Sequence, residues 1–339
     1  MEENSANKSS FTELAARLGR LPAEKKRAAI EVSAALAGVS LRVSRDFVEA
    51  VPKASKVLSA DDLRLWGELG RRLAMGNAET GSQFFAEGVA GLSNVPHDAR
   101  GLVFQVCTRQ LVLSSSIALE TFRLVPQLAK EIGNDHLLHQ ILDLAVNIAN
   151  RSAKHSSDFL KQTPPVASAI AQFGTDRDSV AASVVALAAE FANRTGGMTA
   201  DLWSNLPSAL EALSAENAVK LAQRSAQFLE HGGSVTLHFV SAGSDVLRQA
   251  ETVFDDWCGV LAKIAKSGNA VLIAFLRASP KFFRQISAMK LEGEDVGSVK
   301  TAAIRRVLRL AGEIADADAE SALLTERQVG PLTGFRNKM

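Results

Sequence analysis

The sequence predicts an all-α protein, an α-solenoid built from about seven helical repeats of 36–38 residues. Three observations lead to this prediction. A large aromatic residue recurs along the chain, apolar residues upstream of it have the spacing of one helix face, and signals for strands are scarce. A repeat of this size is too small to bury its own apolar face, so neighbouring repeats have to stack.

The recurring aromatic residue, which we call the anchor, follows an alanine-rich stretch and in most repeats shortly precedes a proline. Successive anchors lie 38, 37, 37, 44, 36 and 36 residues apart. The anchors are Phe47, Phe85, Phe122, Phe159, Trp203, Phe239 and Phe275. The longest spacing predicts an insertion, which we assign to residues 173–178 and to the extra glycine at 196–197.

Apolar residues at offsets 0, 3 and 7 precede each anchor from the second to the seventh, and 3.6 residues per turn place them on one helix face. The first members are Trp66, Phe104, Ile141, Val184, Leu221 and Trp257. The third members are Leu73, Leu111, Ile148, Phe191, Phe228 and Ile264. The second position is apolar except at Arg224. We expect the polar residue before each third member to face solvent, forming a polar ridge of Arg72, Gln110, Asn147, Glu190, Gln227 and Lys263.

Helix boundaries are predicted by caps and prolines. Ser59, Asn134 and Ser214 each lie seven residues before a first member, where a side-chain oxygen can accept hydrogen bonds from the first turn. A proline after the anchor is expected to end or kink the second helix and to open a short third one. These prolines are Pro52, Pro126, Pro164, Pro165, Pro207 and Pro280.

The ends of the chain depart from the repeat. We expect residues 1–10 to be a disordered N-terminus, residues 11–322 to form one repeat solenoid, and residues 323–339 to form a C-terminal tail. Within the solenoid, residues 11–37 predict a charged leading helix pair, and residues 299–322 predict a final helix without an anchor.

The charge balance bears on partners and compartment. Lys and Arg number 38 and Asp and Glu 37, so a net charge of +1 argues against nucleic acid and membranes as partners. The polar start lacks the features of a secretory signal, and no apolar window reaches the roughly 20 residues of a membrane helix. Cys107 and Cys258 show no metal-ligand spacing and suit a reducing cytoplasm, with Cys107 at an apolar repeat position. We therefore expect a cytoplasmic protein.

Catalytic motifs are not found: the sequence has no phosphate-binding glycine loop, nucleophile elbow or dinucleotide-binding pattern. We expect no enzyme and no cofactor. The weak metal candidates are His136, His139 and Asp143, which share a helical stretch, and a metal-dependent enzyme is an alternative if a third strong ligand such as His155 converges on the histidines.

A nucleic-acid-binding repeat protein is a second alternative. It requires arginines to gather on one face, whereas interleaved acidic residues favour a solvated helix surface. The arginines concerned are Arg42, Arg45, Arg71, Arg72, Arg305, Arg306 and Arg309.

Residues 66–74 read Trp-x-x-Leu-Gly-x-x-Leu-Ala and are followed by Phe84-Phe85; residues 257–265 with Phe275 and Pro280 form a related unit. This pattern, over residues 30–285, resembles the helical-repeat regions of bacterial von Willebrand factor A proteins of the nitric oxide reductase activation and carbon monoxide dehydrogenase accessory type. HEAT- and armadillo-like solenoids share much of the spacing. The resemblance implies an AAA+ ATPase or a separate von Willebrand factor A protein as partner, in the maturation of metalloenzymes. The chain lacks the Asp-x-Ser-x-Ser motif, so the resemblance implies no metal-dependent adhesion.

The predicted function is that of a non-catalytic scaffold or adaptor for protein–protein interaction. A stack of repeats exposes an extended surface of polar helix positions, which can bind a long partner without a deep pocket. The polar ridge is our candidate for part of that surface.

Overall fold

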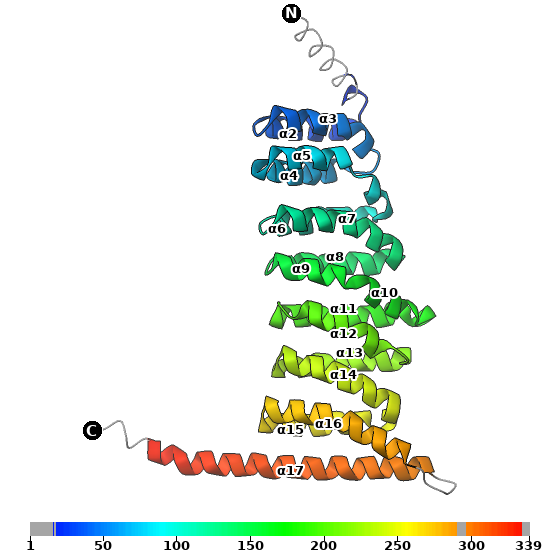
Figure 1. Ribbon diagram of the computed structural model, residues 1–339, viewed down its shortest axis with the longest axis vertical. Coiled ribbons are helices and arrows are strands. Elements are labelled where there is room, and N and C mark those ends of the chain that lie inside the picture. Colours follow the sequence, from blue (N-terminus) through cyan, green and yellow to red (C-terminus); the bar gives the residue numbers. More distant parts are fainter. Residues whose placement is uncertain (1–15, 17, 290–295, 334–339) are drawn as a thin grey trace, which may run out of the picture. The chain divides into compact units, whose positions relative to one another are not determined.

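The computed structural model describes residue 16, residues 18–289 and residues 296–333, with side chains as far as Asp318. In these ranges α-helices and short 3-10 helices alternate with turns and no strand occurs, which confirms the all-α class (Figure 1). The chain divides into two compact units, Met1–Ser168 and Ala169–Met339, and each is described by itself.

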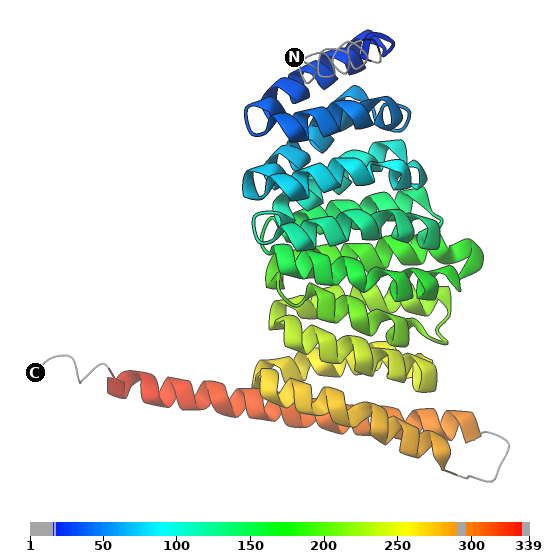
Figure 2. The ribbon, with the colours of Figure 1, turned by 45° about the horizontal axis from the view of Figure 1, so that its top comes forward.

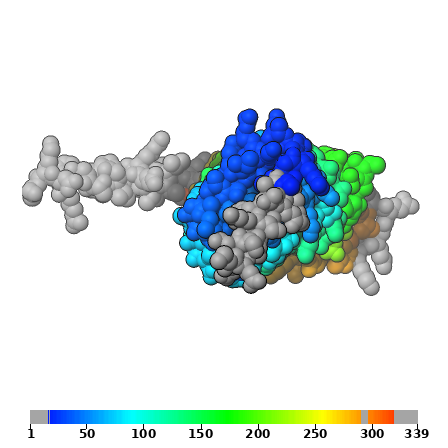
Figure 3. Space-filling view, turned by 90° about the horizontal axis from the view of Figure 1, so that it is seen from above, coloured from blue at the N-terminus to red at the C-terminus, as the bar shows by residue number. Residues whose placement is uncertain are grey.

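Unit 1 consists of helix pairs that lie side by side in chain order, as two views show (Figures 1 and 2). Its elements are α2 (Ala23–Ala37), α3 (Leu41–Ala54), α4 (Ala60–Gly76), α5 (Ala78–Glu87), η1 (Ala90–Asn94), η2 (His97–Ala99), α6 (Arg100–Gln110), α7 (Ser115–Ile132), α8 (Asp135–Ala149) and α9 (Ala153–Lys161). First helices pack on first helices, in the order α2, α4, α6 and α8, and second helices α3 and α5 pack on each other. The pair α2 and α3 forms the N-terminal end of the unit and is coloured blue in Figure 3.

Helix α10 (Thr163–Ala171) spans the boundary between the units. It falls within the longest anchor spacing, so the break in the sequence period coincides with the boundary.

Unit 2 repeats the pairwise arrangement. Its elements are η3 (Gly174–Asp176), α11 (Arg177–Thr195), α12 (Thr199–Leu210), α13 (Ala215–Gln227), η4 (Phe228–His231), α14 (Gly233–Ala250), η5 (Glu251–Val253), α15 (Phe254–Ile264), η6 (Ala265–Ser267), α16 (Asn269–Ala288) and α17 (Val296–Thr333). First helices α11 and α13 pack together, second helices α12, α14 and α16 pack in sequence, and α17 packs on α15.

The anchors form the centre of each core. Phe47, Phe85, Phe159, Trp203 and Phe239 are 0 % exposed, and Phe122 is also buried. The seventh anchor differs from the others, because Phe275 is only partly buried. On either side of it in α16, Leu272 and Leu276 are the fully buried residues, so the inward face of this helix is rotated away from the phenylalanine.

Aromatic rings link neighbouring pairs within unit 1. The ring of Trp66 lies 5.3 Å from that of Phe47 and 4.9 Å from that of Phe85, centroid to centroid. In unit 2, Trp257 stacks on Phe239 at 5.4 Å. Trp66 and Trp257 thus each pack on the anchor of the preceding pair, whereas Phe104 lies against Phe122, the anchor of its own pair, at 6.1 Å.

The predicted helix face is buried, with two exceptions. All first members have an exposed fraction of 2 % or less, and the third members are buried except Leu111, which is partly exposed. Arg224 is partly exposed and donates to Asp255 at 3.1 Å, as its polar character would suggest.

The predicted N-caps are confirmed. Ser59 forms a capping box with Asp62 at the start of α4, Asn134 accepts from Leu137 N at the start of α8, and Ser214 accepts from Asn217 N at the start of α13. These contacts satisfy amide groups that have no partner inside the helix.

The prolines were expected to end or kink the second helices and to open a short third one; in most pairs they neither end the helix nor open a third one. Pro52, Pro126, Pro207 and Pro280 lie inside α3, α7, α12 and α16, and only Pro164–Pro165 lie at the start of a separate helix, α10. The fixed φ of proline is compatible with a helix, and the missing N–H costs a single bond that packing of the apolar face can offset.

The ends differ in part from expectation. Residues 1–10 lie outside the described residues. Of the helix pair expected over residues 11–37, the structure gives bounds for one helix within the described residues, α2. The final helix, α17, extends from Val296 to Thr333, beyond the expected end at 322 and into the segment expected as a tail. None of the helices in the described ranges combines the length and apolar character needed to cross a membrane.

Candidate functional site

The polar ridge is not uniformly exposed in unit 1. Arg72 and Asn147 are exposed, but Gln110 is 0 % exposed, which corrects its prediction as a solvent-facing residue. Gln110 is the last residue of α6, and its Nε2 donates to Ser156 Oγ of α9 at 3.3 Å. Its role is to join two helix pairs inside the core.

The three ridge residues of unit 2 all have partners within the chain. Glu190 is half-buried and accepts from Arg194 at 3.3 Å, and exposed Gln227 accepts from Arg224 at 3.1 Å. Lys263 donates to Asp316 of α17 at 2.7 Å. The final helix therefore engages the last member of the ridge.

The metal candidates lie on α8. His139 Nδ1 is 3.4 Å from Asp98 Oδ2 of η2, and Asp143 accepts from Asn147 at 3.4 Å, while His136 is exposed. Across the described part of the chain, no three His, Cys, Asp or Glu side chains come together in a group that could hold a metal ion.

Both cysteines are free and buried. Burial raises the pKa of the Cys107 thiol well above its usual range and that of Cys258 to about 12. A thiol that stays protonated at neutral pH is a poor nucleophile and a poor metal ligand.

Arginines of the predicted basic clusters have carboxylate partners. Arg71 and Arg72 both donate to Glu68, each at 2.7 Å, and the hydrogen bond from Arg71 is the main reason that the pKa of Glu68 lies below its usual range. Arg42 pairs with Glu79 at 2.9 Å, and Arg305 pairs with Asp256 at 2.9 Å. Such pairs reduce the positive potential that these arginines would offer to a polyanion.

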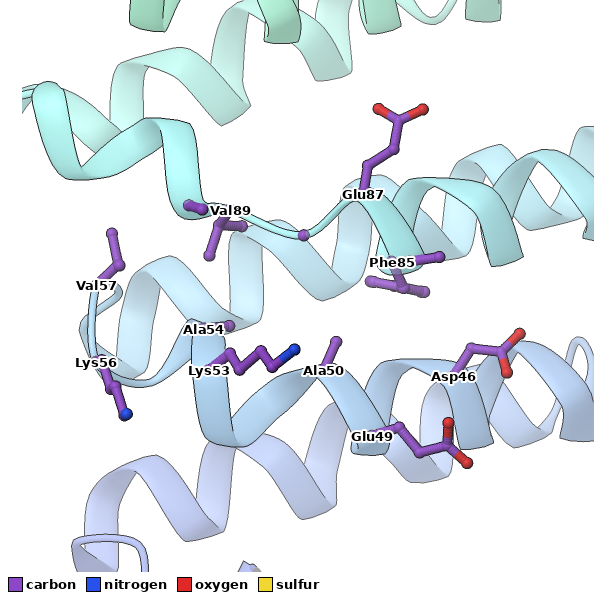
Figure 4. A pocket seen from close by; sticks show the side chains of 13 residues that line it. Asp46, Glu49, Ala50, Lys53, Ala54, Lys56, Val57, Phe85, Glu87 and Val89 are labelled. Carbon is purple, nitrogen blue, oxygen red and sulfur yellow. The ribbon is translucent and has the colours of Figure 1, made fainter.

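A groove of about 820 Å³ lies in unit 1 between α3 and the end of α5, and we call it the α3/α5 groove (Figure 4). One wall is a face of α3 that includes Asp46, Glu49, Ala50, Lys53 and Ala54. The other wall is made of Phe85 to Glu87 of α5 and the segment from Gly88 to Ala90 that follows.

The groove exists because α5 is short. Helix α5 has 10 residues, against 14 in α3 and 18 in α7, and it ends at Gly88, whose φ of 70° is costly for other residues. The chain then turns into η1, which packs against α7. The last turns of α3 are therefore left without a neighbouring α-helix at the position that a longer α5 would fill.

Charges are segregated along the α3 wall. Asp46 and Glu49 lie towards its N-terminal part, and exposed Lys53 and Lys56 lie at its C-terminal end (Figure 4). The floor between them is formed by Ala50, Ala54, Phe85 and Val89, small or apolar side chains that leave room for an incoming chain.

A smaller pocket of about 280 Å³ follows on the other side of Glu87, Gly88 and Val89. Phe122, Pro126 and Lys130 of α7 line its other wall. A Cβ on Gly91 would come within 3.1 Å of Pro126 Cγ, so this glycine allows the close approach of η1 to α7.

The α3/α5 groove was not predicted from the sequence. Two signals could have pointed to it: Phe85 lacks the proline that follows Phe47 by five residues and Phe122 by four, and Gly88 comes three residues after this anchor. Both mark a second helix that differs from its neighbours.

Comparison of the chain with protein-family models, with curated proteins and with solved structures found no match.

Proposed function

We propose that the chain is an α-solenoid of the HEAT and armadillo type that acts as a non-catalytic scaffold or adaptor and binds a protein partner. Support for a repeat architecture comes from side-chain bonds between elements about one period apart. In unit 1 such pairs are Arg42–Glu79 and Lys161–Glu120, each at 2.9 Å. In unit 2, Lys220 pairs with Asp255 at 2.7 Å.

Backbone carbonyls near helix ends are bonded in the same way. Arg248 of α14 donates to the carbonyls of Ser208, Ala209 and Glu211, at and after the end of α12. In unit 1, Lys25 of α2 donates to the Ser55 carbonyl after α3 at 2.6 Å. Bonds of this kind use the carbonyls that a helix leaves free at its C-terminus. The Arg248 bonds join neighbouring pairs, and the Lys25 bond joins the two helices of the first pair.

The observation that carries protein binding is the α3/α5 groove. Sites for small molecules are mostly apolar and enclose the ligand. This groove instead runs along several turns of α3, is open to solvent, and has five charged residues in its walls: Asp46, Glu49, Lys53, Lys56 and Glu87. A surface of this form suits a chain segment of another protein.

The resemblance of residues 66–74 and 257–265 to the repeat regions of von Willebrand factor A accessory proteins supplies the first partners to test. They are an AAA+ ATPase or a separate von Willebrand factor A protein, in the cytoplasm. A helical-repeat chain without a catalytic domain would contribute binding and placement in such a system, with ATP hydrolysis and metal handling left to its partners.

Crosslinking followed by affinity capture of the full chain tests the proposal. We expect one protein to be crosslinked repeatedly, through lysines of this chain, and to form a complex with the purified chain in size-exclusion chromatography. A Trp66→Ala variant, whose core is disrupted, serves as the control bait. Capture of the same proteins by both baits, or of none by either, would contradict a specific scaffold.

A further inference from the structure

The lysines of the α3/α5 groove differ from two arginines around it, because the arginines have carboxylate partners and the lysines have none in the described ranges. Arg45 pairs with Glu49 at 3.7 Å, and Arg123 donates to Glu87 at 3.0 Å. Lys53 and Lys56, by contrast, are exposed, and their side chains make no hydrogen bond or ion pair within the described part of unit 1. Their ammonium groups are available to a ligand.

The carboxylates of the groove are already engaged. Asp46 accepts a hydrogen bond from Ser82 Oγ, Glu49 is next to Arg45, and Glu87 accepts two bonds from Arg123. A serine hydroxyl carries no charge, so Asp46 in the middle of α3 has no counter-charge among the described residues, whereas the charged side chains without a counter-charge at the C-terminal end of α3 are the two lysines.

This positive end continues beyond the groove. Lys56 and Val57 also line an adjoining pocket of about 470 Å³, whose wall includes one acidic residue, Glu24, beside Lys25, His97 and Arg100. Arg100 donates to the carbonyls of Leu92 and Val95 at 3.1 and 3.0 Å, and it forms no ion pair in the part of unit 1 that the structure describes. The C-terminal end of α3 thus lies where lysine and arginine side chains outnumber acidic ones.

The size of the groove suits a helix. An α-helix about 10 Å across, with a pitch of about 5.4 Å, occupies roughly 420 Å³ per turn, so about 820 Å³ holds roughly two turns. Ala54 and Val89 are almost fully buried, so the small apolar side chains that an incoming helix can contact in the groove are Ala50, Ala86 and Ala90. Helix α5, with 10 residues against 14 in α3, leaves the last turn of α3 uncovered.

We infer that the α3/α5 groove binds an acidic amphipathic helix of a protein partner, with its apolar side on Ala50, Ala86 and Ala90 and its carboxylates at Lys53 and Lys56. The inference rests on the proposed function and names the chemistry of the partner. Lys130, which lines the neighbouring pocket on α7 and is also without a described partner, provides a further contact for a longer acidic segment.

The test uses a display library of helix-forming peptides about four turns long, with a constant apolar face and random residues at the polar positions. Peptides are selected on the full chain, and their affinity is measured by fluorescence anisotropy. We expect enrichment of Asp and Glu, with binding at least about tenfold weaker for Lys53→Glu/Lys56→Glu and weaker at higher ionic strength for the native chain.

The matched control is Lys266→Glu/Lys281→Glu, which makes the same change in net charge at two exposed lysines of unit 2. It should bind the selected peptides as the native chain does. Circular dichroism of both double variants checks that each is folded, and because all four lysines are exposed we expect native helix content.

Selection of neutral or basic peptides, or equal binding of acidic peptides by Lys53→Glu/Lys56→Glu, would overturn the inference. If the groove variant still captures the partner of the native chain, protein binding stands and the assignment of the groove falls. If the native chain captures no partner and selects no peptide, the proposed function falls with it.

Discussion

The second helix of a pair begins differently in the two units. In unit 1 the N-cap residues are Ser40, Asn77, Ser114 and Ser152, spaced 37, 37 and 38 residues apart, and all except Ser114 accept a hydrogen bond from the first turn. In unit 2 the second helices α14 and α16 begin at Gly232 and Gly268, which lie 36 residues apart and have no side chain to offer.

The two glycines share one backbone conformation. Gly232 has φ 99° and ψ 161°, and Gly268 has φ 105° and ψ 158°, a region that other residues rarely occupy. Gly196, a further 36 residues upstream, also has a positive φ of 52°. Its ψ of −72° differs from that of the other two glycines, and it caps the end of α11, whereas the N-cap of the second helix α12 is Met198, so this turn is of another kind.

The comparison shows that nearly the same period is kept by two kinds of turn. One satisfies the first amides of the helix with a polar side chain, and the other reverses the chain through a backbone conformation that suits glycine. Substitutions at the N-caps of second helices should therefore change the free energy of unfolding differently in the two units.

The largest effect is expected in the core, at the equivalent residues Trp66 and Trp257. Alanine at either should lower the free energy of unfolding by about 3–5 kcal/mol. Trp257 should be the more costly, because its Nε1 donates to buried Ser279 Oγ at 2.9 Å, whereas Trp66 Nε1 has no hydrogen-bond partner in the described part of the chain. Chemical denaturation of the two variants measures the difference.

Phenylalanine at the same positions isolates the hydrogen bond. Trp257→Phe should destabilise by about 1–2 kcal/mol more than Trp66→Phe, since only the former leaves a buried hydroxyl without its donor. Equal losses for the two phenylalanine variants would show that the Trp257–Ser279 contact contributes nothing.

The second effect concerns the glycine turns. Gly268→Ala should cost about 1–3 kcal/mol because alanine is strained at this φ and ψ, even though no atom lies within 4 Å of the new Cβ. Thermal unfolding followed by circular dichroism measures the loss. Gly259→Ala is the control: this glycine lies within α15 with equally open space around its Cβ, and alanine there should be neutral or stabilising.

The third effect tests the polar turns of unit 1. Ser152→Ala should cost about 1 kcal/mol through loss of the bond to His155 N, whereas Ser152→Gly should cost only a few tenths. Ser114→Ala is the matched control, because the Ser114 side chain makes no cap bond. A loss at Ser114 as large as that at Ser152 would contradict the assignment of the cap.

The smallest effect is acid sensitivity at two carboxylates that each bind two cations. A hydrogen bond from Lys220, with help from Arg224, holds the pKa of Asp255 below its usual range, and Arg71 does the same for Glu68. A depressed pKa in the folded state contributes stability above about pH 4 that is lost as the pH falls through the folded value.

Protonation of Asp255 and protonation of Glu68 should affect different numbers of helices. Glu68 and its arginines lie on one helix, whereas Asp255 links α15 to α13. Hydrogen exchange as the pH is lowered towards 3 should therefore show loosening of both α13 and α15, but of α4 alone in unit 1, with changes of about 0.2–1 kcal/mol. Asp255→Asn should abolish the response in unit 2 and leave that of unit 1 unchanged.

The sequence predicts what depends on local spacing. The helix caps at Ser59, Asn134 and Ser214 and the buried first members follow from the 3.6-residue period, because each depends on a few residues nearby in the chain. The burial of Gln110 depends on a serine 46 residues away, and the rotation of Phe275 out of the core depends on how α16 packs. The α3/α5 groove depends on where two successive second helices, α3 and α5, end, and no single repeat contains both ends.

The burial of the three tryptophans has a spectroscopic consequence. The chain has three Trp and no Tyr, so its intrinsic fluorescence, apart from that of Phe, arises from Trp66, Trp203 and Trp257. Trp66 is the single tryptophan of unit 1, and it sits between phenylalanine rings with its indole N–H unbonded in the described residues. A chain with Trp203→Phe and Trp257→Phe would therefore report, by the red shift of one indole, the opening of unit 1 alone.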